Sequence, residues 1–115
     1  MIPIGGFRVI EHQSFTELTH QYFPDLERSP DGRPSHNDFI VLDLEPTKRF
    51  FSNRFFDLPE LHPGRPDYRV RTFRGQVAPL IQITGQLLPN GQIIELLILE
   101  VDHNPPEAFF RSSYR

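Results

Sequence analysis

A tight turn near the C-terminus constrains the fold more than any other feature of this chain. Residues 89–91 read Pro-Asn-Gly, where proline presets the entry dihedral and asparagine and glycine tolerate positive φ. The turn separates two apolar stretches, residues 80–88 and 92–102, and residues 68–74 before them alternate between apolar and polar side chains. The C-terminal half therefore predicts three consecutive strands joined as an antiparallel meander.

The N-terminal half predicts one further strand and two helices. Residues 7–11 alternate as a short strand does. Ser14 and Glu17 have the spacing of a capping box, so a helix is expected over residues 15–23. Phenylalanines at helical spacing predict a second helix over residues 47–57.

Residues 39–42 allow two interpretations. The run Phe-Ile-Val-Leu is typical of a buried strand, whereas Ser35 and Asp38 offer a competing helix start. With the residues that follow, this run resembles the first motif of the DEDD-type 3′–5′ exonucleases, an apolar strand that ends in Asp-x-Glu. The resemblance implies that Asp43 and Glu45 would hold the metal ions of a two-metal phosphodiester cleavage.

Together these elements predict a single α+β domain over residues 1–115. It should have a mostly antiparallel sheet, a C-terminal three-stranded meander and two helices packed on one face. Strict alternation makes the last strand apolar on both faces, with Ile93, Leu97, Leu99 and Val101 on one and Ile94, Leu96 and Ile98 on the other. Because the helices cover one face, we expect more chain, a second copy or another protein to cover the second face.

The composition excludes several classes of protein. The chain has no cysteine, which excludes disulfides and thiolate metal sites, and a cytoplasmic location is the default expectation. No signal peptide or membrane contact is expected, since no basic leader or long apolar run occurs. The five histidines lack metal-ligand spacing and no phosphate-binding loop is present, so neither a metal nor a cofactor is predicted. The net charge is −3, although residues 48–74 carry +4 and leave room for a local basic patch.

Phenylalanine is abundant for a chain of this size, with 11 residues, which predict a Phe-rich core and a surplus beyond it. Two phenylalanine doublets are flanked by arginine, and aromatic and arginine side chains are the usual anchors of protein interfaces. We therefore expect a small non-catalytic domain that docks on a partner protein or forms a homo-oligomer. The expected contact residues are Phe50, Phe51, Arg54, Phe55, Phe56, Phe109 and Phe110.

An alternative follows from the order of the elements: strand, helix, helix and a meander that carries arginines. In this order, and in the sequence Tyr-Arg-Val-Arg at residues 68–71, the chain resembles the RelE/ParE toxin family. The resemblance implies a ribonuclease that cuts mRNA by general acid–base chemistry and by stabilising charge on the phosphate. RNA is a ligand only in this alternative. Because the two hypotheses differ on catalysis, the sequence leaves open whether the chain is an enzyme. The catalytic residues it implies are Arg69, Arg71, Arg74, Arg111 and Tyr114.

Overall fold

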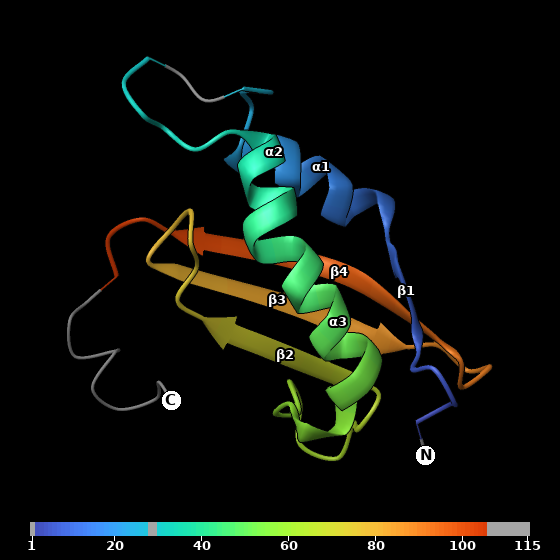
Figure 1. The fold of residues 1–115 in the computed structure, drawn as a ribbon. Coiled ribbons are helices and arrows are strands. Elements are labelled where there is room, and N and C mark those ends of the chain that lie inside the picture. Colours follow the sequence, from blue (N-terminus) through green and yellow to red (C-terminus); the bar gives the residue numbers. More distant parts are fainter. Residues whose placement is uncertain (1, 28–29, 106–115) are drawn as a thin grey trace.

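The computed structural model describes residues 2–27 and 30–105, which form one sheet with helices on one face (Figure 1). The strands are β1 (Arg8–Glu11), β2 (Tyr68–Phe73), β3 (Leu80–Leu87) and β4 (Ile93–Asp102), in the spatial order β1-β4-β3-β2. Strands β2, β3 and β4 form the predicted antiparallel meander, and β1 pairs in parallel with β4. The α+β class with a mostly antiparallel sheet is therefore confirmed.

The turn between β3 and β4 forms as the sequence predicts. The backbone N–H of Leu88 donates to the carbonyl of Ile93 at 2.8 Å. Asn90 Oδ1 accepts the backbone N–H groups of Gln92 and Ile93 at 2.9 and 3.2 Å. Gly91 has a φ of 72°, a left-handed conformation that glycine adopts without strain. All these requirements are local, so the short motif specifies the turn.

Helix α1 (Gln13–Tyr22) begins earlier than the sequence predicts. Its N-cap is His12, whose Nδ1 accepts the backbone N–H of Ser14 at 3.1 Å. The Ser14 hydroxyl instead donates to the carbonyl of Leu97 in β4 at 3.2 Å. The predicted capping box of Ser14 and Glu17 is therefore wrong, because the serine hydroxyl docks the helix on the sheet.

One long helix crosses the sheet (Figure 1). It includes residues 39–42, for which the sequence allowed either a strand or a helix. Its parts are α2 (His36–Phe39), a π-helical turn (Ile40–Leu44), α3 (Glu45–Arg54) and a closing 3₁₀ turn (Phe55–Asp57). Ser35 and Asp38 form a reciprocal capping box, in which each side chain accepts the other residue's backbone N–H at 3.0 Å. The helix interpretation of residues 39–42 is confirmed and the strand interpretation is wrong, because this cap satisfies the first amides of the helix.

Pro46 explains the π-helical turn. Proline has no N–H, so the hydrogen bond that it would donate to the preceding turn is missing. The helix widens at this point, and the backbone N–H of Glu45 donates to the carbonyl of Ile40, five residues earlier. The widened turn buries Asp43 and leaves Glu45 exposed. These two carboxylates do not lie on one face of a strand, so the exonuclease-like arrangement is not formed.

A phenylalanine-rich core fills the space between the helices and the sheet, as predicted. Phe51 lies directly on β3, where a Cβ on Gly85 would come within 2.7 Å of the Phe51 ring. Glycine therefore lets the helix approach the sheet closely at this point. The buried phenylalanines are Phe7, Phe15, Phe23, Phe39, Phe51 and Phe55.

A β-bulge decides which side chains of β4 face the helices. The register between β3 and β4 shifts between Thr84 and Gly85, which leaves Leu97 without a partner. The bulge brings Leu99 onto the helix-facing side, where it is 1% exposed, and leaves Ile98 on the opposite side, where it is 42% exposed. The predicted division of β4 by strict alternation is therefore wrong beyond Leu97.

Helices α1, α2 and α3 lie on the same face of the sheet, and no described helix covers the opposite face (Figure 1). We call that opposite face the open face. By strand register it presents Arg8, Ile10, Tyr68, Val70, Thr72, Leu80, Gln82, Thr84, Gln86, Ile93, Glu95, Ile98, Glu100 and Asp102.

Candidate functional site

The structure divides the predicted contact phenylalanines into buried and exposed. Phe51 and Phe55 are fully buried, because the helical stripe that they form points into the sheet. Phe50 is half-buried and Phe56 is 41% exposed. The prediction that Phe51 and Phe55 contact a partner is therefore wrong. Four other predicted site residues lie outside the described part of the chain: Phe109, Phe110, Arg111 and Tyr114.

Arg69 has a structural role. Its Nε donates to the carbonyl of Pro66 and its Nη1 to the carbonyl of Leu58, both at 2.8 Å. Its guanidinium also lies over the Phe56 ring, 5.5 Å from the centroid. These contacts tie the segment before β2 to the end of the long helix. The geometry does not favour the predicted catalytic role, because the donors already serve the backbone.

Arg71 differs from Arg69, because aromatic rings hold its guanidinium and most of its donors have no partner among the described residues. Its Cζ lies 4.1 Å from the Phe73 ring centroid and 5.1 Å from that of Phe50. Its Nη1 donates to the Thr47 hydroxyl at 2.6 Å. Among the described residues, no carboxylate forms an ion pair with it. We call Arg71, Thr47, Phe50 and Phe73 the Arg71 site.

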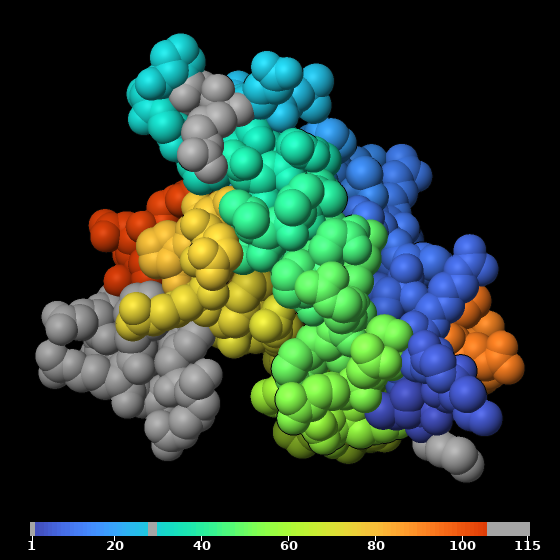
Figure 2. Space-filling view, viewed as in Figure 1, coloured from blue at the N-terminus to red at the C-terminus, as the bar shows by residue number. Residues whose placement is uncertain are grey.

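Asp43 lies near the Arg71 site, but other donors already satisfy its carboxylate. The backbone N–H of Gln76 donates to Oδ1 at 2.8 Å, and that of Val77 donates to Oδ2 at 3.0 Å. The π-helical turn and the β2–β3 connection, which these bonds join, touch in the space-filling view (Figure 2). Burial lowers the pKa of Arg71 from its ordinary value, and the negative charge of Asp43 offsets only part of that effect.

Two more arginines of the basic segment lie near these elements. Arg54 forms an exposed ion pair with Asp57 at 2.9 Å, and its guanidinium lies 5.0 Å from the Phe50 centroid. Arg54 and Arg71 therefore approach the same ring. Arg74 is exposed just after β2. The basic residues of the sequence thus gather partly around Phe50.

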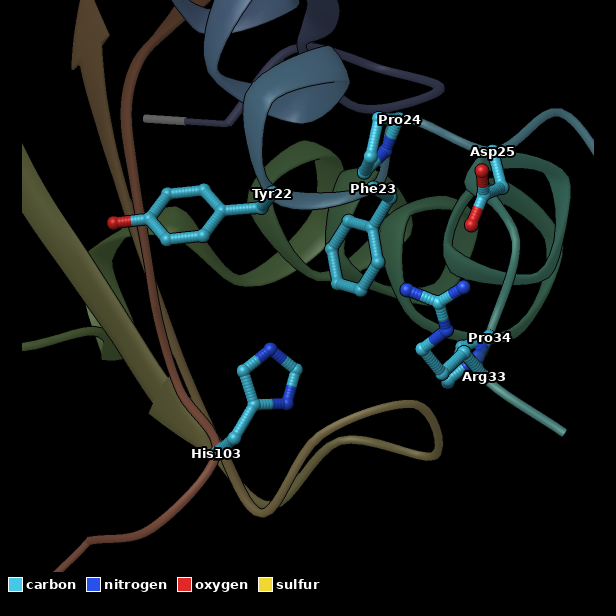
Figure 3. A pocket seen from close by; sticks show the side chains of 7 residues that line it. All are labelled: Tyr22, Phe23, Pro24, Asp25, Arg33, Pro34 and His103. Atoms are coloured by element: carbon cyan, nitrogen blue, oxygen red, sulfur yellow. The ribbon is translucent and has the colours of Figure 1, made fainter. Parts of the chain in front are cut away.

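A pocket of about 310 Å³ lies where the C-terminal end of α1 meets the loop before α2 and the end of β4 (Figure 3). Phe23 lies at its centre and stacks on Phe39, with 4.8 Å between the centroids. His103 and Arg33 lie on either side of Phe23 (Figure 3). Arg33 pairs with Asp31 at 3.1 Å. The volume is at the lower limit for small-ligand pockets, and the cation at its rim already has a counter-ion.

A stacked histidine pair joins α1 to the start of α2, and the sequence carries no local signal for it. The rings of His20 and His36 are parallel within 3°, with 4.2 Å between centroids. His36 Nε2 lies 3.1 Å from the Thr19 hydroxyl. The pKa of His36 is lowered from 6.5, first by burial and then by His20, while Glu11 opposes the shift.

This lowered pKa predicts that the protein loses stability in mild acid. Below pH 6.5 the unfolded chain binds a proton at His36 before the folded chain does, so the free energy of unfolding falls as the pH falls through the folded-state pKa. The melting temperature, measured from pH 8 to pH 5, is expected to decrease. In His36→Gln the decrease should be smaller, and identical profiles for the two proteins would contradict the assignment.

Comparison of the chain with protein-family models, curated proteins and solved structures finds no match. The resemblance to RelE/ParE toxins therefore stays a prediction. In residues 2–27 and 30–105, no three potential metal ligands gather into a site. Within the same residues, no helix has the length and apolarity needed to cross a bilayer.

Proposed function

We propose that the protein is a small non-catalytic interaction domain whose open face docks on a basic segment of a partner protein. The exposed side chain of Ile98 supports this proposal most directly, since it is 42% exposed on a strand whose opposite face is packed in the core. When another surface covers a large aliphatic side chain in the middle of a sheet face, the burial of its apolar area stabilises the complex.

Ile98 lies at the exposed end of a row that crosses three strands, in which Thr84 and Val70 are only 5% and 8% exposed. Val70 of β2 pairs with Thr84 of β3, and Thr84 pairs with Ile98 of β4. Cross-strand neighbours on one face lie close enough to form a continuous surface. Leu80 and Ile10 lie on the same face toward its margins. Ile98 therefore supplies the exposed apolar side chain at the centre of this face, as a protein interface needs.

The charges on the open face favour a basic partner over a second copy of the chain. The carboxylates of Glu95, Glu100 and Asp102 all lie on this face of β4. Among the described residues, the register places one basic side chain there, Arg8 on the edge strand. Two copies meeting face to face would bring like charges together, which is unfavourable. A partner segment with lysine or arginine around an apolar side chain would complement both features.

Replacement of Ile98 by aspartate is expected to reduce capture of the partner from a native lysate at least ~10-fold, as loss of a central anchor does. Val41→Asp is the matched control, because Val41 is 57% exposed on the long helix and should leave capture unchanged. Raising the salt concentration should weaken capture of the wild type. The captured protein, identified by mass spectrometry, should bind through a segment rich in lysine or arginine.

Sedimentation at micromolar concentration separates this proposal from self-association. A monomer is expected for the wild type and for Ile98→Asp. A wild-type dimer that Ile98→Asp converts to a monomer would replace the external partner with a second copy. Equal capture by Ile98→Asp and Val41→Asp would exclude the open face as the docking surface.

A further inference from the structure

The Arg71 site lies on the helix-facing side of the sheet, so its function is independent of the open face. We infer that this site binds an oxyanion, the phosphate or carboxylate group of a ligand. The inference rests on a half-buried guanidinium that has rings and a hydroxyl for neighbours and, among the described residues, no carboxylate within ion-pair distance.

A partly desolvated charge without a counter-ion is costly, and an anion that enters the site removes that cost. The rings of Phe73 and Phe50 restrict the guanidinium, and the Thr47 hydroxyl accepts from Nη1. The donors on Nε and Nη2 of Arg71 stay unused by described groups, and they form the fork that binds two oxygens of one anion. Arg71, Phe50 and Phe73 are all partly exposed, so the site reaches the surface of the protein.

The nearby carboxylate does not occupy the fork. Asp43 accepts backbone N–H groups from Gln76 and Val77, and these bonds hold it against the β2–β3 connection. Gly75 makes this possible, because a Cβ there would come within 2.9 Å of Asp43 Oδ2. Asp43 thus shapes the loop beside the site and leaves Arg71 to a ligand.

The test measures binding of inorganic phosphate and of acetate to the full chain by calorimetry. Arg71→Gln is expected to lower the affinity for the bound anion at least ~10-fold, because it removes a charge-assisted bidentate contact. Arg49→Gln is the matched control, since it removes the same charge from an exposed position on α3 and should change the affinity less than about 2-fold. Arg71→Lys keeps the charge but loses the fork, so its affinity should fall between those of the wild type and Arg71→Gln.

The wild type is also titrated with each anion, and the NMR signal of the Arg71 Nε–H is followed. This measurement keeps the test decisive even where a variant fails to fold. A shift with phosphate but not acetate assigns the site to phosphate-bearing ligands, and the reverse result assigns it to carboxylates. Absence of a shift with both anions, or equal losses in Arg71→Gln and Arg49→Gln, would overturn the inference.

Discussion

Replacement of Phe51 by alanine is expected to destabilise the protein by about 4 kcal/mol, the loss typical of a fully buried phenylalanine. The Phe51 side chain is 0% exposed and lies against Gly85, which has no side chain to move into the space. The cavity would therefore persist and add to the lost burial energy. In urea unfolding, the midpoint should fall while the slope stays unchanged.

Phe56→Ala is the matched control, because Phe56 belongs to the same sequence doublets but is 41% exposed. Its ring meets the Phe55 ring edge-to-face at 5.3 Å, so a loss of at most about 1 kcal/mol is expected. Equal losses for Phe51→Ala and Phe56→Ala would contradict the inward orientation of the phenylalanine stripe. Comparison of these two variants also separates core residues from surface residues among the phenylalanines that the sequence predicts as contact residues.

Replacement of Asp43 by alanine is expected to cost about 3 kcal/mol. The variant would remove the acceptor of the backbone N–H groups of Gln76 and Val77 and leave the buried Val77 amide unpaired. The β2–β3 connection would lose its attachment to the long helix. Urea unfolding measures the loss, and amide hydrogen exchange at Gln76 and Val77 should become faster.

Glu45→Ala is the control for Asp43→Ala, because Glu45 lies two residues later and is exposed. Its expected effect is within about 0.5 kcal/mol. Asp43→Asn should cost less than Asp43→Ala, since the amide oxygen still accepts from one backbone N–H. Similar losses for Asp43→Ala and Glu45→Ala would show that Asp43 does not anchor the connection.

The candidate site could be predicted only in part. The sequence singles out Arg69 and Arg71 equally, as two arginines on one strand. The structure separates them, because Arg69 meets the carbonyls of Pro66 and Leu58 and Arg71 meets two rings and a hydroxyl. Which acceptors lie opposite each arginine depends on how the long helix crosses β2, and no local pattern contains that information.

The phenylalanines show the same division. Helical spacing correctly places Phe51 and Phe55 on one stripe of the helix. It does not tell which stripe faces the sheet. The sequence therefore could not show which phenylalanines belong to the core and which belong to a contact surface. The burial of each ring decides which phenylalanines are core residues, and that burial depends on how much of the sheet the helix covers.

The sequence alone determines the β3–β4 turn, the meander and the Phe-rich core, because each rests on local dihedral preferences or on side-chain periodicity. Only the tertiary structure decides the parallel pairing of β1 with β4, the bulge at Leu97 and the open face. These features depend on contacts between segments far apart in the chain, whose free energies no short pattern records. The helix start at Ser35 shows both influences, since its cap is local but the stacking of Phe39 on Phe23 depends on where α1 lies.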